Sequence, residues 1–134
     1  MTIFDTDTFT LLQREESKAK ATLQARLSRV DPAEIRITVI TYEEQTRGWL
    51  DYKAHAKPGI EEVNAYAKLK KHLEGYRAIT LLDFCLDAAA ELQRLRRMRI
   101  RVGTMDLKIA AIALVHDATL LSANLRHFDK VPGL

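Results

Sequence analysis

The chain has 134 residues, of which 47% are hydrophobic and 29% are charged, a composition that excludes an intrinsically disordered protein. This length predicts a single domain over residues 1–134, and the net charge of +3 permits nucleic-acid binding without requiring it. The one cysteine, Cys85, excludes an intrachain disulfide and a cysteine-rich metal site, and we interpret it as a packing or helix-start residue. No uncharged stretch approaches the length of a membrane span, so we expect a cytoplasmic protein with no membrane partner.

The N-terminal part of the chain predicts a strand, a helix and a second strand. Ile3-Phe4 is a short apolar segment that leads directly into Asp5, which is typical of a buried central strand. Residues 8–30 consist mainly of helix formers and predict one helix, which Asp31-Pro32 ends. Residues 35–40 are rich in β-branched side chains and predict the second strand.

The rest of the chain predicts further helices separated by short strands. Thr41-Tyr42-Glu43-Glu44 is a capping-box sequence, so we expect a helix to start there, and another is expected from near Pro58 to near Gly75. We also expect an extended segment at 78–82, a helix at 86–98, a core helix at 105–116 and a strand at 119–122. Because strands alternate with helices, the fold class predicted is α/β with a mainly parallel sheet of four to five strands.

Five arginines fall within eight positions, just before the predicted core helix. They are Arg94, Arg96, Arg97, Arg99 and Arg101. Such a run is typical of a solvated helix face, and it is equally a pattern that contacts phosphate groups or a partner protein. The sequence leaves both interpretations open.

Polar side chains follow three of the predicted strands or open the core helix. Asp5 ends the first strand, Glu44 lies on the first helical turn after the second, and Asp106 opens the core helix. Asn124 follows the last strand. Ligands of open α/β sheets bind beyond the carboxyl ends of the strands, so these residues, which are far apart in the sequence, are expected to converge.

Converging carboxylates favour a bound cation. Two carboxylates about 4 Å apart repel by roughly 4 kcal/mol at an effective dielectric constant near 20, unless a proton or a cation offsets the repulsion. Oxygen ligands favour Mg²⁺ or Mn²⁺, whereas zinc sites usually draw on His or Cys at spacings that this chain lacks. Such an ion would polarise a phosphodiester and activate a water molecule, which predicts metal-dependent phosphodiester hydrolysis.

Each acid also has a purely structural explanation. Asp5 and Asp7 are suited to capping the following helix, and Glu44 is the acid that a capping box starting at Thr41 requires. Asp106 favours the dipole of its own helix. The order and the flanking residues of the acids are what distinguish the functional interpretation from these alternatives.

Four segments, in this order along nearly the whole chain, resemble the PIN-domain family. They are Ile3 to Asp7, Thr38 to Gly48, Gly103 to Ala111 and Leu121 to Phe128. The first resembles the family's apolar strand ending in Asp-Thr-Asn, and the second its strand with a threonine and an acid three residues later. The third resembles the Asp-x-x-Ile-Ala-Ala helix start, and the fourth the closing Thr-x-Asn-x-x-acid-Phe loop.

The resemblance is strongest to VapC-type toxin ribonucleases of bacterial VapBC toxin–antitoxin pairs. It implies a three-layer α/β/α sandwich, RNA as substrate, Mg²⁺ or Mn²⁺ as cofactor, a homodimer, and inhibition by a cognate antitoxin protein. It also implies that Asp5, Glu44 and Asp106 hold the metal and that Asn124 supports the site or orients water. Glu44 is preferred to Glu43 because only Glu44 has the family's offsets from the preceding threonine and the following glycine.

Three further residues are possible auxiliary members of the site. Asp7 stands where the family usually has Asn, so it adds a carboxylate to the site or binds a second ion. His127 stands where many relatives have Asp or Glu, and it is interpreted as a packing or hydrogen-bonding residue or as a proton donor or phosphate contact. Thr104 is expected to cap the core helix, with a hydrogen bond to a ligand as the alternative.

Two other functions remain alternatives at this stage. The segment Ile3 to Thr8 also resembles the Asp-x-Asp-x-Thr loop of haloacid-dehalogenase-type phosphatases, in which Asp5 would attack phosphate and Asp7 would handle the proton. No convincing later acidic pair for Mg²⁺ accompanies that loop. A noncatalytic module that only binds another protein is the second alternative, and the three intact acids argue against it.

Overall fold

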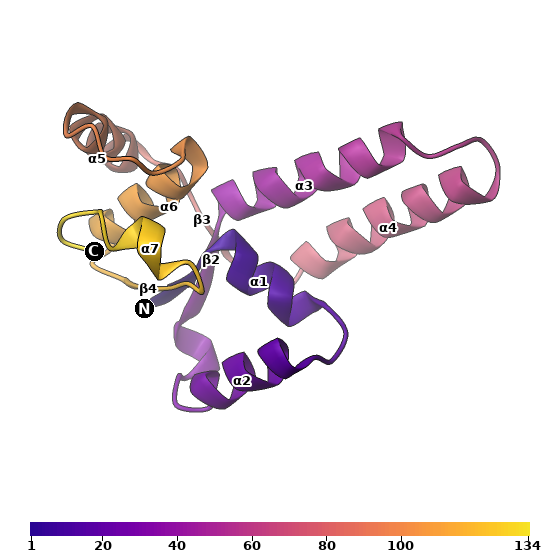
Figure 1. The fold of residues 1–134 in the computed structure, drawn as a ribbon, viewed down its shortest axis with the longest axis horizontal. Helices are drawn as coiled ribbons and strands as arrows, with labels where there is room; N and C mark the ends of the chain where they lie inside the picture. Colours follow the sequence, from indigo (N-terminus) through magenta and orange to yellow (C-terminus); the bar gives the residue numbers. More distant parts are fainter.

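The computed structural model describes residues 1–134 and contains four strands and seven α-helices (Figure 1). The elements in chain order are β1 (Thr2–Phe4), α1 (Thr6–Gln13), α2 (Lys18–Leu27), a 3-10 turn (Pro32–Glu34), β2 (Ile35–Thr38), α3 (Val39–Ala54), α4 (Ile60–Tyr76), β3 (Leu81–Leu82), α5 (Leu86–Arg97), α6 (Thr104–Val115), β4 (Thr119–Leu121) and α7 (Leu125–Phe128). The predicted α/β fold is confirmed.

The four strands form one parallel sheet in the order β3-β2-β1-β4. Parallel strands need crossover connections, and here helices supply them, so that helices flank the sheet (Figure 1). The central strand β1 pairs with β2 through Ile3 and Arg36 and with β4 through Phe4 and Leu121. All four carboxyl ends therefore lie at one edge of the sheet, where Asp5 follows β1.

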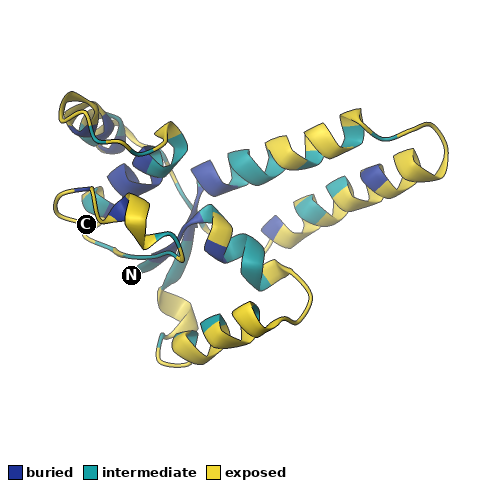
Figure 2. Cartoon of the chain, in the orientation of Figure 1, coloured by how far each residue is buried: buried dark blue, intermediate teal, exposed yellow.

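Helix α6 forms much of the core. Its residues Leu107 and Ile109 to Ala113 are buried, so α6 is the core helix that the sequence predicted (Figure 2). The small alanines let α5 pack closely, with Leu92 and Leu95 buried against α6. Because the core fixes α6, the position of Asp106 on its first turn is fixed as well.

Helices α3 and α4 project from the sheet as a long hairpin (Figure 1). Most of the hairpin is exposed (Figure 2), and its exposed large apolar side chains are Leu50, Tyr52, Ile60, Val63, Tyr66 and Leu73. At the base of the hairpin, the ring of Tyr76 packs edge-on against the rings of Phe9 and Tyr42. The contact with Phe9 joins the hairpin to α1.

The prediction of one helix over residues 8–30 was wrong, because α1 ends at Gln13 and α2 begins at Lys18. Ser17 caps α2, and its side chain accepts a hydrogen bond from the backbone N–H of Lys20. The helix-forming composition of the segment conceals this break.

The prediction of a strand through Ile40 and of a capping box at Thr41 was also wrong. Strand β2 ends at Thr38, which is the N-cap of α3 and accepts a hydrogen bond from the backbone N–H of Thr41. Glu44 consequently lies on the second turn of α3 rather than the first. It has no capping role to explain it.

The remaining predicted boundaries differ only slightly from the structure. Helix α4 begins at Ile60 after Gly59, whose φ of 98° favours glycine, so Pro58 precedes the helix. The extended segment predicted at 78–82 contains only the two-residue strand β3. Cys85 is the exposed N-cap residue of α5, which agrees with the helix-start interpretation. The helices fall short of the length and apolar character that crossing a membrane requires.

Candidate active site

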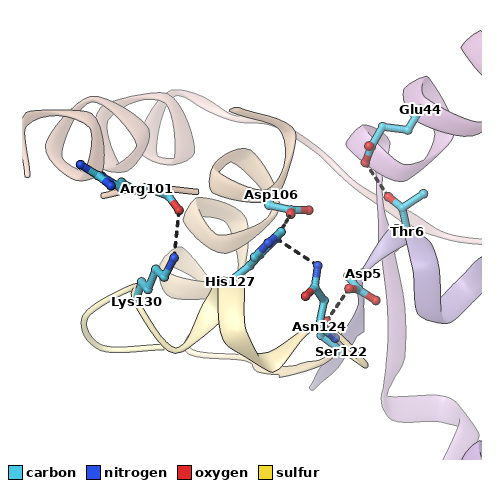
Figure 3. A network of polar contacts seen from close by, with 9 residues as sticks. All are labelled: Asp5, Thr6, Glu44, Arg101, Asp106, Ser122, Asn124, His127 and Lys130. Carbon is cyan, nitrogen blue, oxygen red and sulfur yellow. Dashed lines mark hydrogen bonds and ion pairs between the residues drawn. The ribbon is translucent and has the colours of Figure 1, made fainter. Parts of the chain in front are cut away.

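Asp5 is held firmly at the carboxyl end of β1. It is 3% exposed, and its Oδ1 accepts a hydrogen bond of 2.9 Å from the backbone N–H of Thr8 in the first turn of α1. Its Oδ2 accepts a hydrogen bond from the hydroxyl of Ser122, directly after β4, at 2.5 Å (Figure 3). The same Ser122 oxygen accepts from the backbone N–H of Asn124. Asp5 therefore caps a helix and joins two neighbouring strand ends.

Glu44 reaches the same edge of the sheet from α3. Its Oε1 accepts a hydrogen bond of 2.6 Å from the hydroxyl of Thr6 (Figure 3). Because the Thr6 hydrogen points to Glu44, the hydroxyl of Thr41 at 3.0 Å donates to Thr6. Glu43 behaves differently, since it forms an exposed ion pair with Arg47 at 2.6 Å. The structure thus directs Glu44, and not Glu43, toward β1.

Asp106 stands on the first turn of α6, and His127 from α7 lies beside it. His127 Nδ1 is 3.4 Å from Asp106 Oδ2 and 3.0 Å from the side-chain nitrogen of Asn124 (Figure 3). Thus Asn124, the predicted fourth member of the site, contacts Asp106 only through His127. In this view the carboxylates of Asp5, Glu44 and Asp106 lie around the end of β1.

Neighbouring carboxylates contribute to raised pKa values at Glu44 and Asp106. Burial raises the pKa of Glu44 above its usual range, and the charges of Asp106, Asp7 and Glu43 raise it further, although the Thr6 hydrogen bond opposes them. Burial likewise raises the pKa of Asp106, with Asp5 and Asp7 adding to the shift and His127 opposing it. Four carboxylates from α1, α3, α6 and the end of β1 therefore share one electrostatic environment, which a cation would stabilise.

The residues fit a divalent cation that keeps part of its water shell. The structure groups no three His, Cys, Asp or Glu side chains tightly enough to surround one ion directly. Mg²⁺ usually retains several waters and takes only one or two carboxylates, and the oxygen donors here suit Mg²⁺ or Mn²⁺. Glu44 and Asp106, whose pKa is raised, are the carboxylates whose negative charge a cation would stabilise.

The family model described as "PIN domain" matches residues 2–134 of this chain. The chain belongs to the PIN-domain family. The match favours the nuclease hypothesis over the phosphatase hypothesis, because it covers almost every residue whereas the phosphatase resemblance was confined to one loop.

The proteins similar to this PIN domain include a VapC ribonuclease and a VapBC complex. The protein "Ribonuclease VapC1" of Rickettsia felis is 30% identical over 106 residues, and the match covers 66% of this chain and 79% of that protein. The crystal structure of VapBC2 from Rickettsia felis bound to a DNA fragment from their promoter is similar, with TM-score 0.69 and 20% identity over 99% of this chain and 94% of that chain. FitAcB from Neisseria gonorrhoeae gives TM-score 0.71 and 20% identity over 97% and 92% of the two chains. These structures show that the fold is shared.

The three auxiliary residues of the site, Asp7, Thr104 and His127, differ in part from what the sequence indicated. Asp7 is exposed and acts on Glu44 and Asp106 through its charge. Thr104 is the exposed first residue of α6 and not its cap, because Gly103 holds the N-cap position and no side chain caps the helix there. The expected capping role of Thr104 was therefore wrong. His127 is exposed and makes polar contacts, which agrees with its interpretation as a hydrogen-bonding residue.

Two hydroxyl residues of the site escaped the sequence analysis. Thr6 donates to Glu44, and Ser122 donates to Asp5. Thr6 lies between two candidate acids and Ser122 directly follows a predicted strand, so their positions were the available signal. Their partners are 38 and 117 residues away, which sequence spacing does not reveal.

Proposed function

We propose that this PIN domain is a metal-dependent endoribonuclease that hydrolyses RNA phosphodiester bonds, the toxin component of a VapBC-type toxin–antitoxin pair. The observation that carries the proposal is the shared environment of Asp5, Asp7, Glu44 and Asp106 at the carboxyl edge of the sheet. The 30% identity to Ribonuclease VapC1 supports RNA as the substrate.

In this mechanism Asp5, Glu44 and Asp106 would hold a Mg²⁺ or Mn²⁺ ion, directly or through its waters. An ion held there would supply Lewis acidity toward a phosphodiester and would lower the pKa of water, which is the chemistry that phosphodiester hydrolysis needs. Asp5 keeps its place because Thr8 and Ser122 bind both of its oxygens. Asn124 holds the His127 ring against Asp106 and thereby positions that carboxylate.

Thr6 and Thr41 orient Glu44 in the same way. Thr41 donates to Thr6, which donates to one oxygen of Glu44 and leaves its other oxygen available to the ion. Such hydrogen bonds to a ligating carboxylate fix its direction before the ion arrives. Both threonines come from elements that begin at the sheet edge, α1 and α3.

The proposed partners are a cognate antitoxin protein and a second copy of this chain. Solved structures with this fold include a VapBC complex from Salmonella typhimurium bound to DNA, which supports an antitoxin partner. The α3–α4 hairpin exposes large apolar side chains, among them Ile60, which is 73% exposed, and Val63, which is 63% exposed. Apolar surface of this kind is typical of protein interfaces, so we place a protein partner on this hairpin.

The test is cleavage of an RNA panel by purified protein with Mg²⁺, Mn²⁺ or chelator. We expect cleavage only with a divalent cation, and we expect D106N to lose at least about a hundredfold in rate because it removes a metal ligand. E43Q is the matched control, since it removes the neighbouring acid that pairs with Arg47, and it should cleave normally. A pure protein that binds its antitoxin but cuts no RNA with either ion would leave only the noncatalytic binding module.

A further inference from the structure

Four arginines near the end of α5 have no acidic partner. Arg94 is engaged by Glu91, whose Oε1 accepts from Arg94 Nε at 3.0 Å. The other four are exposed and form no ion pair, namely Arg96, Arg97, Arg99 and Arg101. Between Glu91 and Asp106 the sequence contains no acidic residue. A solvated helix face normally mixes charges of both signs, so this run concentrates positive charge.

The helix dipole accounts for only part of the run. Arg96 and Arg97 lie in the last turn of α5, where cations are favoured. Arg99 and Arg101 lie beyond the helix end at Met98, where the dipole gives no such advantage. Arg99 moreover has a φ of 52°, at the position after a helix where glycine is the preferred residue. Folding alone therefore favours glycine over arginine at position 99.

Arg101 lies in the connection between α5 and α6, shortly before the helix that carries Asp106. Arg101 is three residues before α6, and Asp106 is five positions further along the chain, a span of at most about 18 Å. Lys130 Nζ donates to the Arg101 carbonyl at 3.5 Å, which brings a third cation from the end of the chain (Figure 3). In this view Arg101 and Lys130 lie on one side of Asp106, with Asp5 and Glu44 on the other, and the Arg101 guanidinium extends outward, away from Asp106.

We propose that Arg99, Arg101 and Lys130 bind the sugar–phosphate backbone of RNA beside the acidic site. The proposal rests on the ribonuclease function proposed above. A cluster of four carboxylates repels a polyanionic substrate, so neighbouring cations are needed to hold the RNA. RNA fits this surface because arginine and lysine bind the phosphate backbone through charge, independently of the base sequence.

The first test measures RNA binding in chelator, where no cleavage occurs. A labelled single-stranded RNA of mixed sequence is titrated with wild type and with R99G/R101A at several salt concentrations. We expect about tenfold weaker binding and a salt dependence whose slope falls by about 1.4, since two phosphate contacts are lost. R77A, which removes one exposed arginine directly after α4, is the control and should bind within about twofold of wild type.

The second test separates binding from folding at one position. R99G relieves the left-handed conformation, so we expect its Tm to rise by about 2–5 °C while RNA affinity falls severalfold. A merely structural arginine would not move the two readouts in opposite directions. RNA affinity equal to wild type in R99G/R101A would overturn the proposal, as would a loss confined to antitoxin binding.

The outcomes also distinguish this inference from the proposed function. Failure of the ribonuclease function would appear as absent cleavage with every metal, whatever the arginine variants bind. Failure of the inference would appear as normal RNA affinity in R99G/R101A together with metal-dependent cleavage. Both variants are compared with R77A under the same conditions, so a general effect of net charge is measured separately.

Discussion

Asp5 at the end of β1 and Asp106 at the start of α6 are both acids of one site, but they differ in burial and in hydrogen bonding. Asp5 is buried, and both of its oxygens accept hydrogen bonds, from Thr8 and Ser122. Asp106 is partly exposed, contacts only the His127 ring, and has a raised pKa. Asp5 therefore contributes to the fold as well as to the site, whereas Asp106 carries a charge that the fold does not compensate.

The largest expected effect is a difference in stability between variants of Asp5 and of Asp106. D5A removes a helix cap and leaves Ser122 without its partner, so we expect it to lower the free energy of unfolding by about 2–4 kcal/mol. D106N removes a repelled charge and should leave stability unchanged or slightly higher. Urea unfolding of both variants in chelator measures the difference. Equal destabilisation by the two substitutions would contradict the division of roles.

The pH dependence of stability is expected to reveal the acids whose pKa is raised, Asp106 and Glu44. The pKa of Asp106 is raised from 3.8 and that of Glu44 from 4.5, so the folded protein binds more protons than the unfolded chain above those values. In metal-free protein, the contribution of these two groups to the free energy of unfolding therefore falls as the pH rises from about 4 through the raised pKa values. The fall is at most about 1.4 kcal/mol per pH unit for each group.

Unfolding midpoints measured from pH 4 to pH 7 test this prediction. The difference between wild type and D106N isolates Asp106 from the many exposed acids, including Glu91, whose pKa is lowered and whose effect has the opposite sign. We expect the fall in stability to be shallower in D106N. A difference that stays constant across the whole range would show that the protein does not perturb Asp106.

A smaller effect is expected from the hydroxyl that orients Glu44. T6V removes the hydrogen bond that lowers the pKa of Glu44, so the proton competes better with the metal. We expect Mn²⁺ affinity to fall about tenfold, the usual effect of losing a partner of a metal ligand. T22V is the matched control, because Thr22 is an exposed residue of α2 that bonds only the Lys18 carbonyl. Equal Mn²⁺ affinity in T6V and wild type would remove Thr6 from the site.

The smallest effect is expected at Glu43, the acid next to Glu44. Its ion pair with Arg47 is exposed, and such pairs contribute between 0 and about 1 kcal/mol. E43Q should therefore change the free energy of unfolding by less than about 1 kcal/mol and leave Mn²⁺ affinity within about twofold of wild type. Calorimetry and urea unfolding on one preparation measure both. A large loss of metal affinity in E43Q would reverse the choice between the two glutamates.

The sequence predicted those parts of the fold that local pattern determines. The apolar run before Asp5 marked the central strand, and the apolar and small residues Ile109 to Ala113 marked the buried helix. Sequence order and flanking residues also indicated Asp5, Glu44 and Asp106 as one group, and the structure brings them to one edge of the sheet. Their role as metal ligands stays a prediction.

Other features depend on contacts that the sequence does not display. Thr38 and Thr41 are both suited to capping a helix, and the choice depends on Thr41 meeting Thr6 from α1. The break between α1 and α2 lies in a segment of helix formers, where Ser17 and its bond to Lys20 decide the start of α2. The partners of Thr6 and Ser122 arise only when the sheet forms.

The most direct test of the account is calorimetric titration of Mn²⁺ into chelator-treated, metal-free protein. It measures the ion itself, without substrate, partner or cleavage. The account predicts saturable binding by wild type and by E43Q, and at least about tenfold weaker binding by D106N. Absence of binding to wild type, or equal binding by D106N and wild type, would contradict the claim that these carboxylates form a cation site.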